Sequence, residues 1–262
     1  MAPVETSEQA AAISLTARAA VVPGRGARPI EVLPPDLPII VTIDGPAGTG
    51  KSSVGRALAL RLGLDFLDTG AMYRAAAAIV IDERIPFDDA AAIVERVAEA
   101  ELRFDWRTDP PAIIAFDRPM GSRIRDEDVT RVVSPLSALA PLRRLMVTKQ
   151  RRIAAEHPRL VSEGRDQGSV VFPDALVKFY LFASAQVRAE RRAAQLRERE
   201  IDADVARLRA EIEARDASDM TRAVGPLTCP DDAVRLDTSE LSFDEVVDAL
   251  ERVVRERATS GR

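Results

Sequence analysis

The chain has 262 residues, of which 37 are Lys or Arg and 42 are Asp or Glu, giving a formal net charge of −5. This acidic balance argues against a nucleic-acid-binding domain, although clustered arginines can still bind a small polyanion. A single cysteine excludes an intrachain disulfide framework, and a single histidine argues against a His-based zinc site or a Ser–His–Asp hydrolase. The length suits one globular domain with an insertion.

The first 36 residues differ from the remainder of the chain. Prolines and glycines interrupt every periodic pattern there, which predicts a flexible N-terminal extension with at most a short helix over residues 8–20. No apolar run approaches the length that spans a bilayer, and no basic stretch precedes an apolar core near the N-terminus. We therefore expect no membrane partner and a cytoplasmic location.

Strand and helix signals alternate from residue 39 onward. The first four elements are predicted as strand, helix, strand and helix over residues 39–43, 51–62, 64–67 and 71–82. The first strand is a β-branched run, as expected for a strand that is buried on both faces. Gly63 lies just past the first helix, where glycine commonly ends a helix. This order predicts a parallel sheet with right-handed crossover connections.

The middle of the chain changes character. After a helix over residues 90–100, three extended pieces are predicted over residues 101–106, 112–116 and 118–124. Their close spacing indicates a small antiparallel insert. Two helices are then predicted over residues 128–139 and 141–156, and Pro141 would open the second, because its missing N–H costs nothing in a first turn.

Parallel α/β character returns after residue 158. Strands are predicted over residues 159–162, 176–182 and 233–237. A long arginine-rich helical region is predicted over residues 185–215, and a final helix over 242–257 begins with a capping box of Ser242 and Glu245. The complete pattern predicts an α/β fold with a central parallel sheet flanked by helices.

A glycine-rich loop lies between the first predicted strand and the first predicted helix. It satisfies the pattern G-x-x-x-x-G-K-[ST] with Gly45, Pro46, Ala47, Gly48, Thr49, Gly50, Lys51 and Ser52, and Ser53 follows. Glycines let successive backbone N–H groups turn toward a phosphate, and the helix N-terminus adds positive charge. Lys51 is placed to reach the β- and γ-phosphates, and the Ser52 hydroxyl to bind Mg²⁺. A chance glycine turn rarely has both flanking elements, so the loop predicts ATP or GTP binding.

Two further polar segments follow predicted strands and suit an anionic second ligand. Residues 68–74 begin a helix, where the Thr69 hydroxyl is placed to cap the helix and Arg74 to reach an anion. Residues 163–168 follow the strand at 159–162, so they lie where open α/β sheets bind ligands. The alternatives are an ordinary capped helix with a solvated arginine, and a polar surface turn.

Together these segments resemble the bacterial-type cytidylate kinases over about residues 39–250. The resemblance rests on residues 43–46 with the phosphate loop, 68–74, Gly164-Arg165-Asp166 with Gly168 and 170–173, and Arg215-Asp216 with 222–224. It implies the P-loop nucleoside monophosphate kinase fold and ATP-dependent phosphorylation of CMP and dCMP to CDP and dCDP. It also implies Mg²⁺, nucleotides as the only partners, and a monomer. A kinase domain over residues 37–262 would comprise a core of 37–88 and 157–262, a monophosphate-binding insert of about 89–156 and a lid of about 188–220.

The resemblance also assigns roles to individual residues. Arg74 and Arg165 match the pair that holds the CMP phosphate, a bidentate task that suits guanidinium groups. The cytosine-reading positions match Ser134, Arg143, Asp166 and Arg222. The ribose-contacting positions match Arg215 and Asp219, with Tyr73 beside the sugar and Thr69 at the same site. The lid over ATP matches Arg191 and Arg192, and the catalytic set would be Lys51, Arg165 and Arg191.

Several of these positions have simpler interpretations. Arg191 and Arg192 belong to a charged run of the kind that is usually a solvated helix face. Ser134 is equally compatible with an ordinary helix position. Asp219 and Arg222 would then form an exposed i,i+3 ion pair of little energetic value.

The sequence departs from the family pattern at three positions. Gln167 replaces an apolar residue, Ser169 replaces threonine, and Ser218 stands where arginine is common. These changes bear on discrimination among CMP, dCMP and UMP. Competing functions are a P-loop kinase acting on UMP, AMP or shikimate, a nucleotide-dependent switch or nucleic-acid ATPase, and a non-catalytic nucleotide sensor. The strand at 176–182 does not end in a Walker-B acid, and Lys51 with Ser52 is intact, so a kinase is expected.

Overall fold

The computed structural model describes Leu33 and residues 37–198 and 200–260. Apart from Leu33, the predicted N-terminal extension with its helix at 8–20 lies outside the described residues. Within the described ranges, no helix is both long and apolar enough to cross a membrane.

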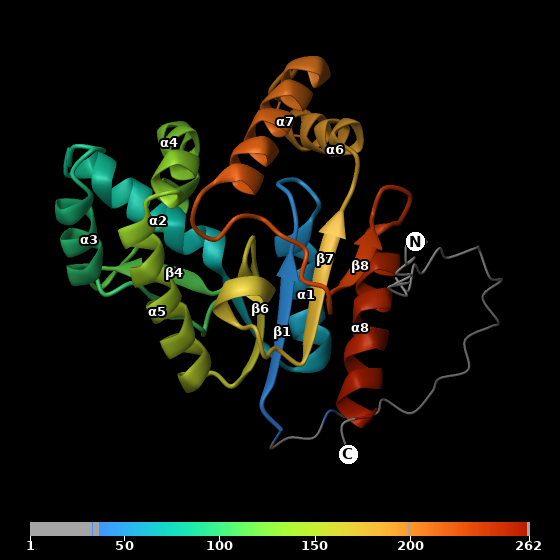
Figure 1. Ribbon diagram of the computed structural model, residues 1–262. Helices are drawn as coiled ribbons and strands as arrows, with labels where there is room; N and C mark the ends of the chain where they lie inside the picture. The colour runs from blue at the N-terminus through green and yellow to red at the C-terminus, as the bar shows by residue number, and fades with distance from the viewer. Residues whose placement is uncertain (1–32, 34–36, 199, 261–262) are drawn as a thin grey trace, which may run out of the picture. The chain divides into compact units, whose positions relative to one another are not determined.

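A parallel sheet occupies the middle of the fold (Figure 1). Its strands are β1 (Ile39–Asp44), β2 (Asp65–Asp68), β6 (Arg159–Gly164), β7 (Val177–Phe182) and β8 (Val234–Asp237). Their order is β2-β6-β1-β7-β8, and every neighbouring pair is parallel. The predicted α/β fold class is confirmed, and all five predicted core strands form. Because β1 lies between β6 and β7, its carboxyl end is a topological switch point, where such sheets bind ligands.

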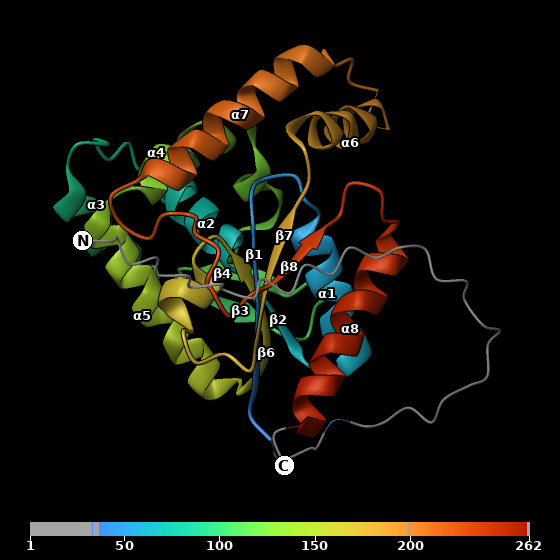
Figure 2. The ribbon, with the colours of Figure 1, turned by 45° about the vertical axis from the view of Figure 1, so that its right-hand side comes forward.

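One face of the sheet is covered by α1 (Lys51–Leu62) and α8 (Phe243–Ser260), which pack side by side (Figure 2). Their apolar faces join the inner residues of β1 and β7 in one buried cluster, to which Leu33 also belongs. Both predicted helix ends are confirmed. Gly63 ends α1 with φ 64°, and Ser242 and Glu245 make the reciprocal bonds of a capping box.

A second buried cluster lies under the helices on the other side. It centres on α2 (Thr69–Asp82), α3 (Ala90–Glu99), α4 (Glu127–Ser137) and α5 (Ala140–Glu156). The four alanines at 75–78 of α2 are fully buried. Small side chains let neighbouring elements approach α2 closely from several directions, so this helix is the hub to which the insert is attached.

The insert contains an antiparallel sheet of β3 (Arg103–Asp105), β4 (Ala112–Ala115) and β5 (Arg118–Pro119). The predicted insert therefore forms, but the extended piece expected over residues 118–124 was wrong beyond Pro119. Gly121 adopts φ 53°, and residues Gly121–Arg125 form a 3₁₀ helix, η1. The left-handed turn at Gly121 ends pairing with β4 because it redirects the backbone away from the sheet.

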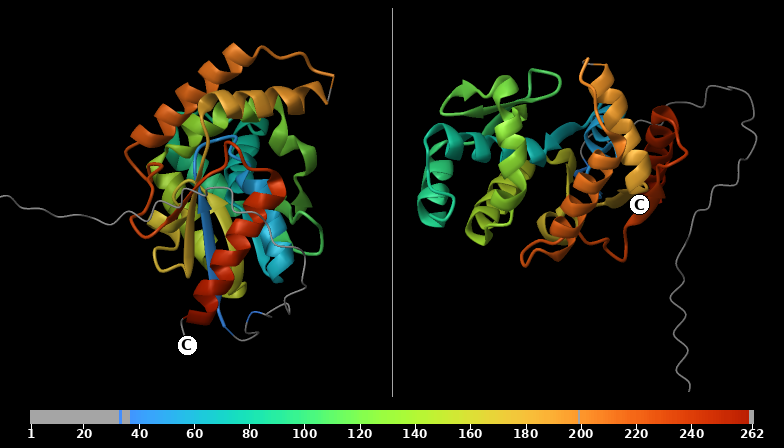
Figure 3. Two further views of the ribbon diagram at one scale, coloured as in Figure 1. Left: turned by 90° about the vertical axis from the view of Figure 1, so that its right-hand side faces the viewer. Right: turned by 90° about the horizontal axis from the view of Figure 1, so that it is seen from above.

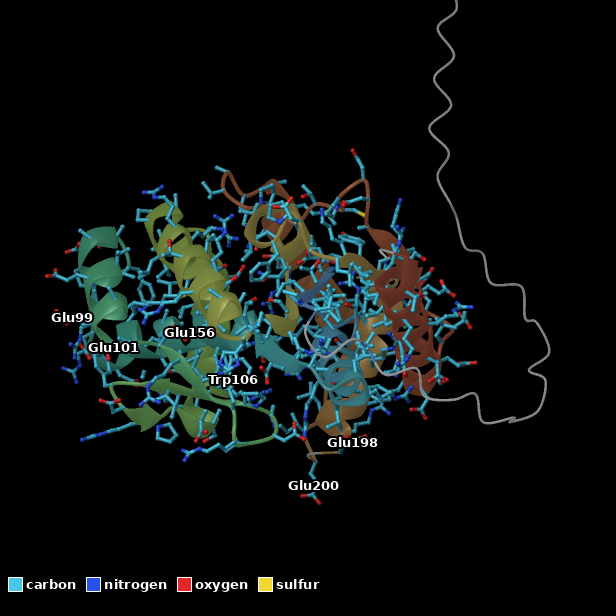
Figure 4. All side chains as sticks on the ribbon, turned by 90° about the horizontal axis from the view of Figure 1, so that it is seen from below. Glu99, Glu101, Trp106, Glu156, Glu198 and Glu200 are labelled. Carbon is cyan, nitrogen blue, oxygen red and sulfur yellow. The ribbon has the colours of Figure 1, made fainter. Side chains whose placement is uncertain are left out.

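Two helices, α6 (Ala185–Arg197) and α7 (Val205–Thr221), lie above the carboxyl ends of β1 and β7 (Figures 1 and 3). The prediction of one continuous helical region over 185–215 was therefore wrong, because the chain leaves the helix between Arg197 and Val205. Glu200 has φ 61°, and the Asp204 side chain accepts a hydrogen bond of 2.8 Å from the Ala206 N–H to begin α7. Figure 4 labels Glu198 and Glu200 at this connection, and Glu200 points away from the core.

Candidate active site

The phosphate loop connects β1 to α1 as predicted. Gly45 has φ 146°, and a Cβ atom there would overlap the carbonyl oxygen of Leu181 on β7, so only glycine fits. Gly50 precedes α1 with φ 86°. Lys51 Nζ donates to the Pro46 carbonyl oxygen at 2.6 Å and lies 3.5 Å from Thr49 Oγ1, which keeps its ammonium group folded against the loop.

A cavity of about 570 Å³ opens beside this loop, and we call it the donor-side cavity. Its size lies within the range of roughly 300–1,000 Å³ typical of small-molecule sites. Of the residues predicted to bind ATP, those that line it are Ala47, Gly48, Gly50, Lys51, Ser52, Ser53, Arg191 and Arg192. Gly45, Pro46 and Thr49 shape the loop but do not line the cavity.

The charge state of Lys51 is set by its surroundings. Burial lowers its pKa to about 7, and the nearby Arg165 guanidinium acts in the same direction. Removing an ammonium group from water penalises its charged form, so the side chain is poised to gain charge when an anion enters. A polyphosphate is such an anion.

Glu163, at the end of β6, belongs to the segment 163–168 that was expected where ligands bind, but it was given no role of its own. Its carboxylate accepts a hydrogen bond from Ser52 Oγ at 3.0 Å, and burial together with the neighbouring Asp68 raises its pKa to about 8. Its position directly after a buried strand was the available signal, because acidic residues at such strand ends commonly orient the metal in P-loop proteins. The hydroxyl and carboxylate oxygens of this pair are ligands of the kind that Mg²⁺ takes. In the described part of the chain no group of three His, Cys, Asp or Glu side chains could hold a metal by itself.

A second, smaller cavity of about 80 Å³ adjoins the first, and we call it the acceptor-side cavity. Nine of the ten residues predicted for the monophosphate site line it, namely Thr69, Tyr73, Arg74, Arg143, Arg165, Asp166, Arg215, Asp219 and Arg222. Arg74, Arg165 and Arg215 line both cavities. The structure thus brings three guanidinium groups to the boundary between two sites.

Ser134 is the exception among the predicted residues. The α4 side chains that line the acceptor-side cavity are Val133 and Ser137. They are four residues apart and share one face of the helix, whereas Ser134 is rotated by about 100° from Val133 and about 60° from Ser137. Its carbonyl oxygen accepts a hydrogen bond of 2.8 Å from Ser137 Oγ.

Buried ion pairs organise the acceptor-side cavity. Arg143 and Asp166 form a hydrogen-bonded pair in which both side chains are at most 5% exposed. Asp219 lies 2.9 Å from Arg165 Nε and 3.6 Å from Arg222 Nη1. Asp219 and Arg222 are each 6% exposed at the side chain, so the simpler interpretation as an exposed ion pair was wrong. Such pairs hold guanidinium groups in fixed orientations, which bidentate recognition of a ligand requires.

Arg215 on α7 has no such partner at its Nε, which is buried and without a hydrogen bond among the described residues. Burial lowers the pKa of this guanidinium to about 10, and the proximity of Arg165 contributes further. A buried N–H group without a hydrogen-bond acceptor is unfavourable. At the boundary of two cavities it is well placed to receive an anionic ligand from either side.

The start of α2 differs from the prediction. The Asp68 carboxylate, rather than the Thr69 hydroxyl, caps the helix by accepting from the Ala71 N–H at 2.9 Å. Thr69 Oγ1 instead donates to the Glu163 carbonyl oxygen at 2.7 Å and ties α2 to the end of β6. Arg74, one turn into α2, donates to Thr130 Oγ1 at 2.9 Å, and it is not a freely solvated side chain.

The loop after β6 is held by hydrogen bonds to Asp44, at the end of β1. The Asp44 carboxylate accepts from the N–H groups of Gln167 and Gly168 at 2.9 and 2.7 Å, although burial raises its pKa to about 6. Gln167, the polar departure from the family pattern, is buried. It accepts from Ser162 Oγ at 2.8 Å and donates to Gln150 Oε1 at 3.2 Å, so its polarity is used within the fold.

Three arginines of α6 face the donor-side cavity. Arg191 is partly buried and donates to Thr238 Oγ1 at 3.2 Å, whereas Arg192 donates to Gln195 Oε1 at 3.5 Å. Arg188 was not predicted. It donates to the carbonyl oxygens of Ala183 and Ala47 at 3.0 and 2.9 Å and pairs with Asp216 of α7 at 2.6 Å. Arg188 therefore connects α6 to both the phosphate loop and α7.

Comparison with known proteins identifies close relatives. A family model described as cytidylate kinase matches residues 41–256. A cytidylate kinase of Nocardia farcinica is 49% identical over 229 residues, which cover 86% of this chain and 97% of the relative. One of Mycobacterium leprae is 44% identical over 220 residues, covering 84% of this chain and 97% of the relative.

Solved structures give more distant matches. A gluconokinase of Sinorhizobium meliloti superposes with a TM-score of 0.45 at 17% identity, covering 85% of this chain and 95% of that one. A shikimate kinase of Bacteroides thetaiotaomicron gives a TM-score of 0.43 at 15% identity, with coverage of 83% and 98%.

Proposed function

The chain belongs to the cytidylate kinase family, and we propose that it transfers the γ-phosphoryl group of ATP onto CMP and dCMP. The observation that carries this proposal is the pair of adjoining cavities. One opens onto the phosphate loop, the other is lined by buried arginine–aspartate pairs, and three arginines lie at their boundary. This arrangement suits a reaction in which two anionic nucleotides must meet.

In this proposal the donor-side cavity holds MgATP. The loop N–H groups and Lys51 would hold the β- and γ-phosphates. The Ser52 hydroxyl would be a ligand of Mg²⁺, and Glu163, which accepts a hydrogen bond from Ser52, would orient that hydroxyl. Mg²⁺ supplies charge neutralisation between the β- and γ-phosphates. Lys51 gains its full charge as the phosphates enter, because their negative charge opposes the effect of burial.

The acceptor-side cavity would hold the monophosphate. Arg74 and Arg165 are placed to bind the acceptor phosphate, and Arg143, Asp166 and Arg222 to bind the base. Arg215 and Asp219 would contact the ribose. The acceptor oxygen is already anionic, so transfer needs alignment and charge neutralisation rather than a general base.

The insert and the lid would exclude water when both nucleotides are present. We assign the insert to residues of about 89–156 and the lid to about 188–220, with Arg191 and Arg192 entering from the lid. Closure of both over the reacting groups would limit hydrolysis of ATP.

The acceptor is tested by measuring initial rates with MgATP and CMP, dCMP, UMP, AMP or shikimate. We expect CMP and dCMP to be the best acceptors, and Lys51→Ala to abolish transfer while leaving the fold intact. A higher kcat/KM for UMP, AMP or shikimate would refute the proposal, and so would full activity of Lys51→Ala.

Recognition of the base is tested at Arg222. This guanidinium donates to the Gly225 carbonyl oxygen and lies beside Asp219, within the acceptor-side cavity. Replacing it with methionine removes charge-assisted hydrogen bonds, so the KM for CMP should rise about ten- to a hundredfold and the preference over UMP should weaken. Arg209→Met, an exposed change on the helix α7 that precedes Arg222, is the matched control. An unchanged CMP-to-UMP ratio in Arg222→Met would remove this residue from the base site.

A further inference from the structure

The 3₁₀ helix η1 (Gly121–Arg125) directs three consecutive side chains to three different places. Arg123 lies 2.6 Å from Asp82 of α2 and 2.8 Å from Asp128 of α4. Ile124 is buried in the cluster beneath the insert. Arg125 lines the donor-side cavity. Because its two neighbours are fixed, η1 presents Arg125 to the cavity from an anchored backbone.

The Arg125 guanidinium is uncompensated. Among the residues that the structure describes, no hydrogen bond or ion pair engages it, although Asp126 follows it directly. Asp126 is bound instead by Arg123 at 3.0 Å. Arg131, another exposed arginine of the insert, pairs with Glu127 at 2.9 Å. Arg118 and Arg144 of the insert also have no acidic partner among the described residues, but Arg125 differs from them because it lines the donor-side cavity.

Arg125 is held close to other positive charges. The carbonyl oxygen of Ile124 accepts a hydrogen bond of 3.3 Å from Arg74 Nη1, which brings η1 against the boundary of the two cavities. Burial lowers the pKa of Arg74; the Asp68 carboxylate opposes this effect, and the charges of Arg125, Arg192 and Arg165 reinforce it. Like charges gathered around a cavity repel one another, and a polyanion bound among them would relieve that repulsion.

We propose that Arg125 is a further catalytic residue, contributed by the insert, that contacts the phosphoryl group in transit between the two nucleotides. This inference rests on the proposed function. During transfer the bond between the γ-phosphorus and the β,γ-bridging oxygen breaks while a bond from an acceptor-phosphate oxygen forms. Arg125 donates hydrogen bonds to the equatorial oxygens of the transferred group, where negative charge is spread in the transition state.

The assignment to the transferred group, rather than to the acceptor phosphate, follows from position. Arg125 lines the donor-side cavity and is not among the residues that line the acceptor-side cavity. Arg125 also belongs to the insert, whereas Lys51 begins α1 and Arg191 lies on α6. A charge on the insert reaches the phosphoryl group only when the insert is in place, so the acceptor can control its arrival.

The test compares Arg125→Met and Arg125→Lys with the wild type, and uses Arg131→Met as the matched control on the same insert. We expect kcat for CMP phosphorylation to fall about a hundredfold in Arg125→Met, the usual effect of losing one donor to a transition state. The Kd for CMP alone, measured by calorimetry, should stay within about threefold of the wild type, because that interaction forms only in transfer. Arg125→Lys should recover part of kcat. Thermal stability should not change, because Arg125 has no partner to lose.

Each outcome shows whether Arg125 contacts the transferred phosphoryl group. A wild-type kcat in Arg125→Met would overturn the proposal and leave Arg125 a solvated surface residue. A rise of about a hundredfold in the CMP Kd with an unchanged kcat would also overturn the proposal, because it would show that Arg125 binds the acceptor phosphate instead. Failure of the wild type itself to phosphorylate CMP would instead reject the proposed function, so the two failures are distinguishable.

Discussion

Lys51 shows how strongly its environment can change one side chain. Its Nζ is surrounded by opposing influences: burial, Arg165 and Arg215 lower its pKa, whereas Glu163 and Asp44 raise it. Burial is the largest of these, and the resulting pKa of about 7 leaves a fraction of the amine uncharged at neutral pH. An uncharged amine is a nucleophile, so this lysine should be chemically reactive as well as phosphate-binding.

The expected reactivity can be measured by acylation of lysine amines followed by peptide mass spectrometry. The chain has only two other lysines, Lys149 and Lys178. Labelling of Lys51 should increase as the pH rises through about 7, because deprotonation exposes the nucleophile. MgATP should suppress it, because phosphate charge restores the ammonium form. Lys178, which pairs with Asp232 at 2.7 Å, provides the unreactive comparison. Labelling of Lys51 that follows no midpoint near neutrality would contradict this account.

At the scale of elements, ion pairs differ greatly in what they contribute. Arg188 and Asp216 join α6 to α7 with side chains that are 5% and 12% exposed. Arg61 and Asp248 join α1 to α8, but their side chains are 35% and 68% exposed. Breaking a buried pair leaves an uncompensated charge in a poorly solvated site, whereas an exposed charge is simply rehydrated.

Two isosteric substitutions compare these pairs. Asp216→Asn should lower the free energy of unfolding by about 3–5 kcal/mol, because the Arg188 charge stays buried without a carboxylate. Asp248→Asn should lower it by less than about 1 kcal/mol. Urea unfolding monitored by circular dichroism gives both values. Equal effects of the two changes would show that burial does not determine the contribution of the α6–α7 pair.

Elements with strong local signals were predictable from the sequence. The helix α1 begins and ends at the predicted residues, because a glycine loop precedes it and Gly63 ends it. The five core strands were also found: β1 and β7 are mostly apolar runs, whereas β8 alternates apolar and charged residues. The break between α6 and α7 was missed because charged residues on both sides have good helix propensity, and the turn depends on the backbone at Glu200.

The candidate site was predictable where chemistry is carried by a motif. The phosphate loop and most of the arginines lie where the family resemblance placed them. Glu163 and Arg188 were given no role because their importance comes from contacts with residues 111 and 141 positions away, Ser52 and Ala47. Ser134 was assigned to the base site by the family resemblance, but the α4 residues that line the cavity are Val133 and Ser137.

At the scale of the whole kinase domain, the size of the acceptor-side cavity requires the elements around it to move before a nucleotide can bind. The acceptor-side cavity of about 80 Å³ is well below the size of roughly 300 Å³ at which small-molecule sites begin. A nucleotide can therefore enter only if the lining elements separate. If the insert moves, one contact that must break is the exposed pair of Asp109, in the turn between β3 and β4, and Arg56 of α1, which lie 2.6 Å apart.

Removing that tie should ease the separation and admit the acceptor faster. In Asp109→Asn we expect the association rate constant of CMP to rise by no more than about fivefold, the limit set by the weakness of exposed ion pairs. Asp117→Asn is the matched control, because Asp117 is also exposed and pairs with Arg103 inside the insert, so it restrains no movement relative to α1. Stopped-flow binding of CMP measures both variants, and the KM for ATP should not change in either. Equal association rates in the wild type and in Asp109→Asn would mean that the insert opens without breaking this contact, and that the barrier to entry lies in the buried arginine–aspartate pairs around the acceptor-side cavity.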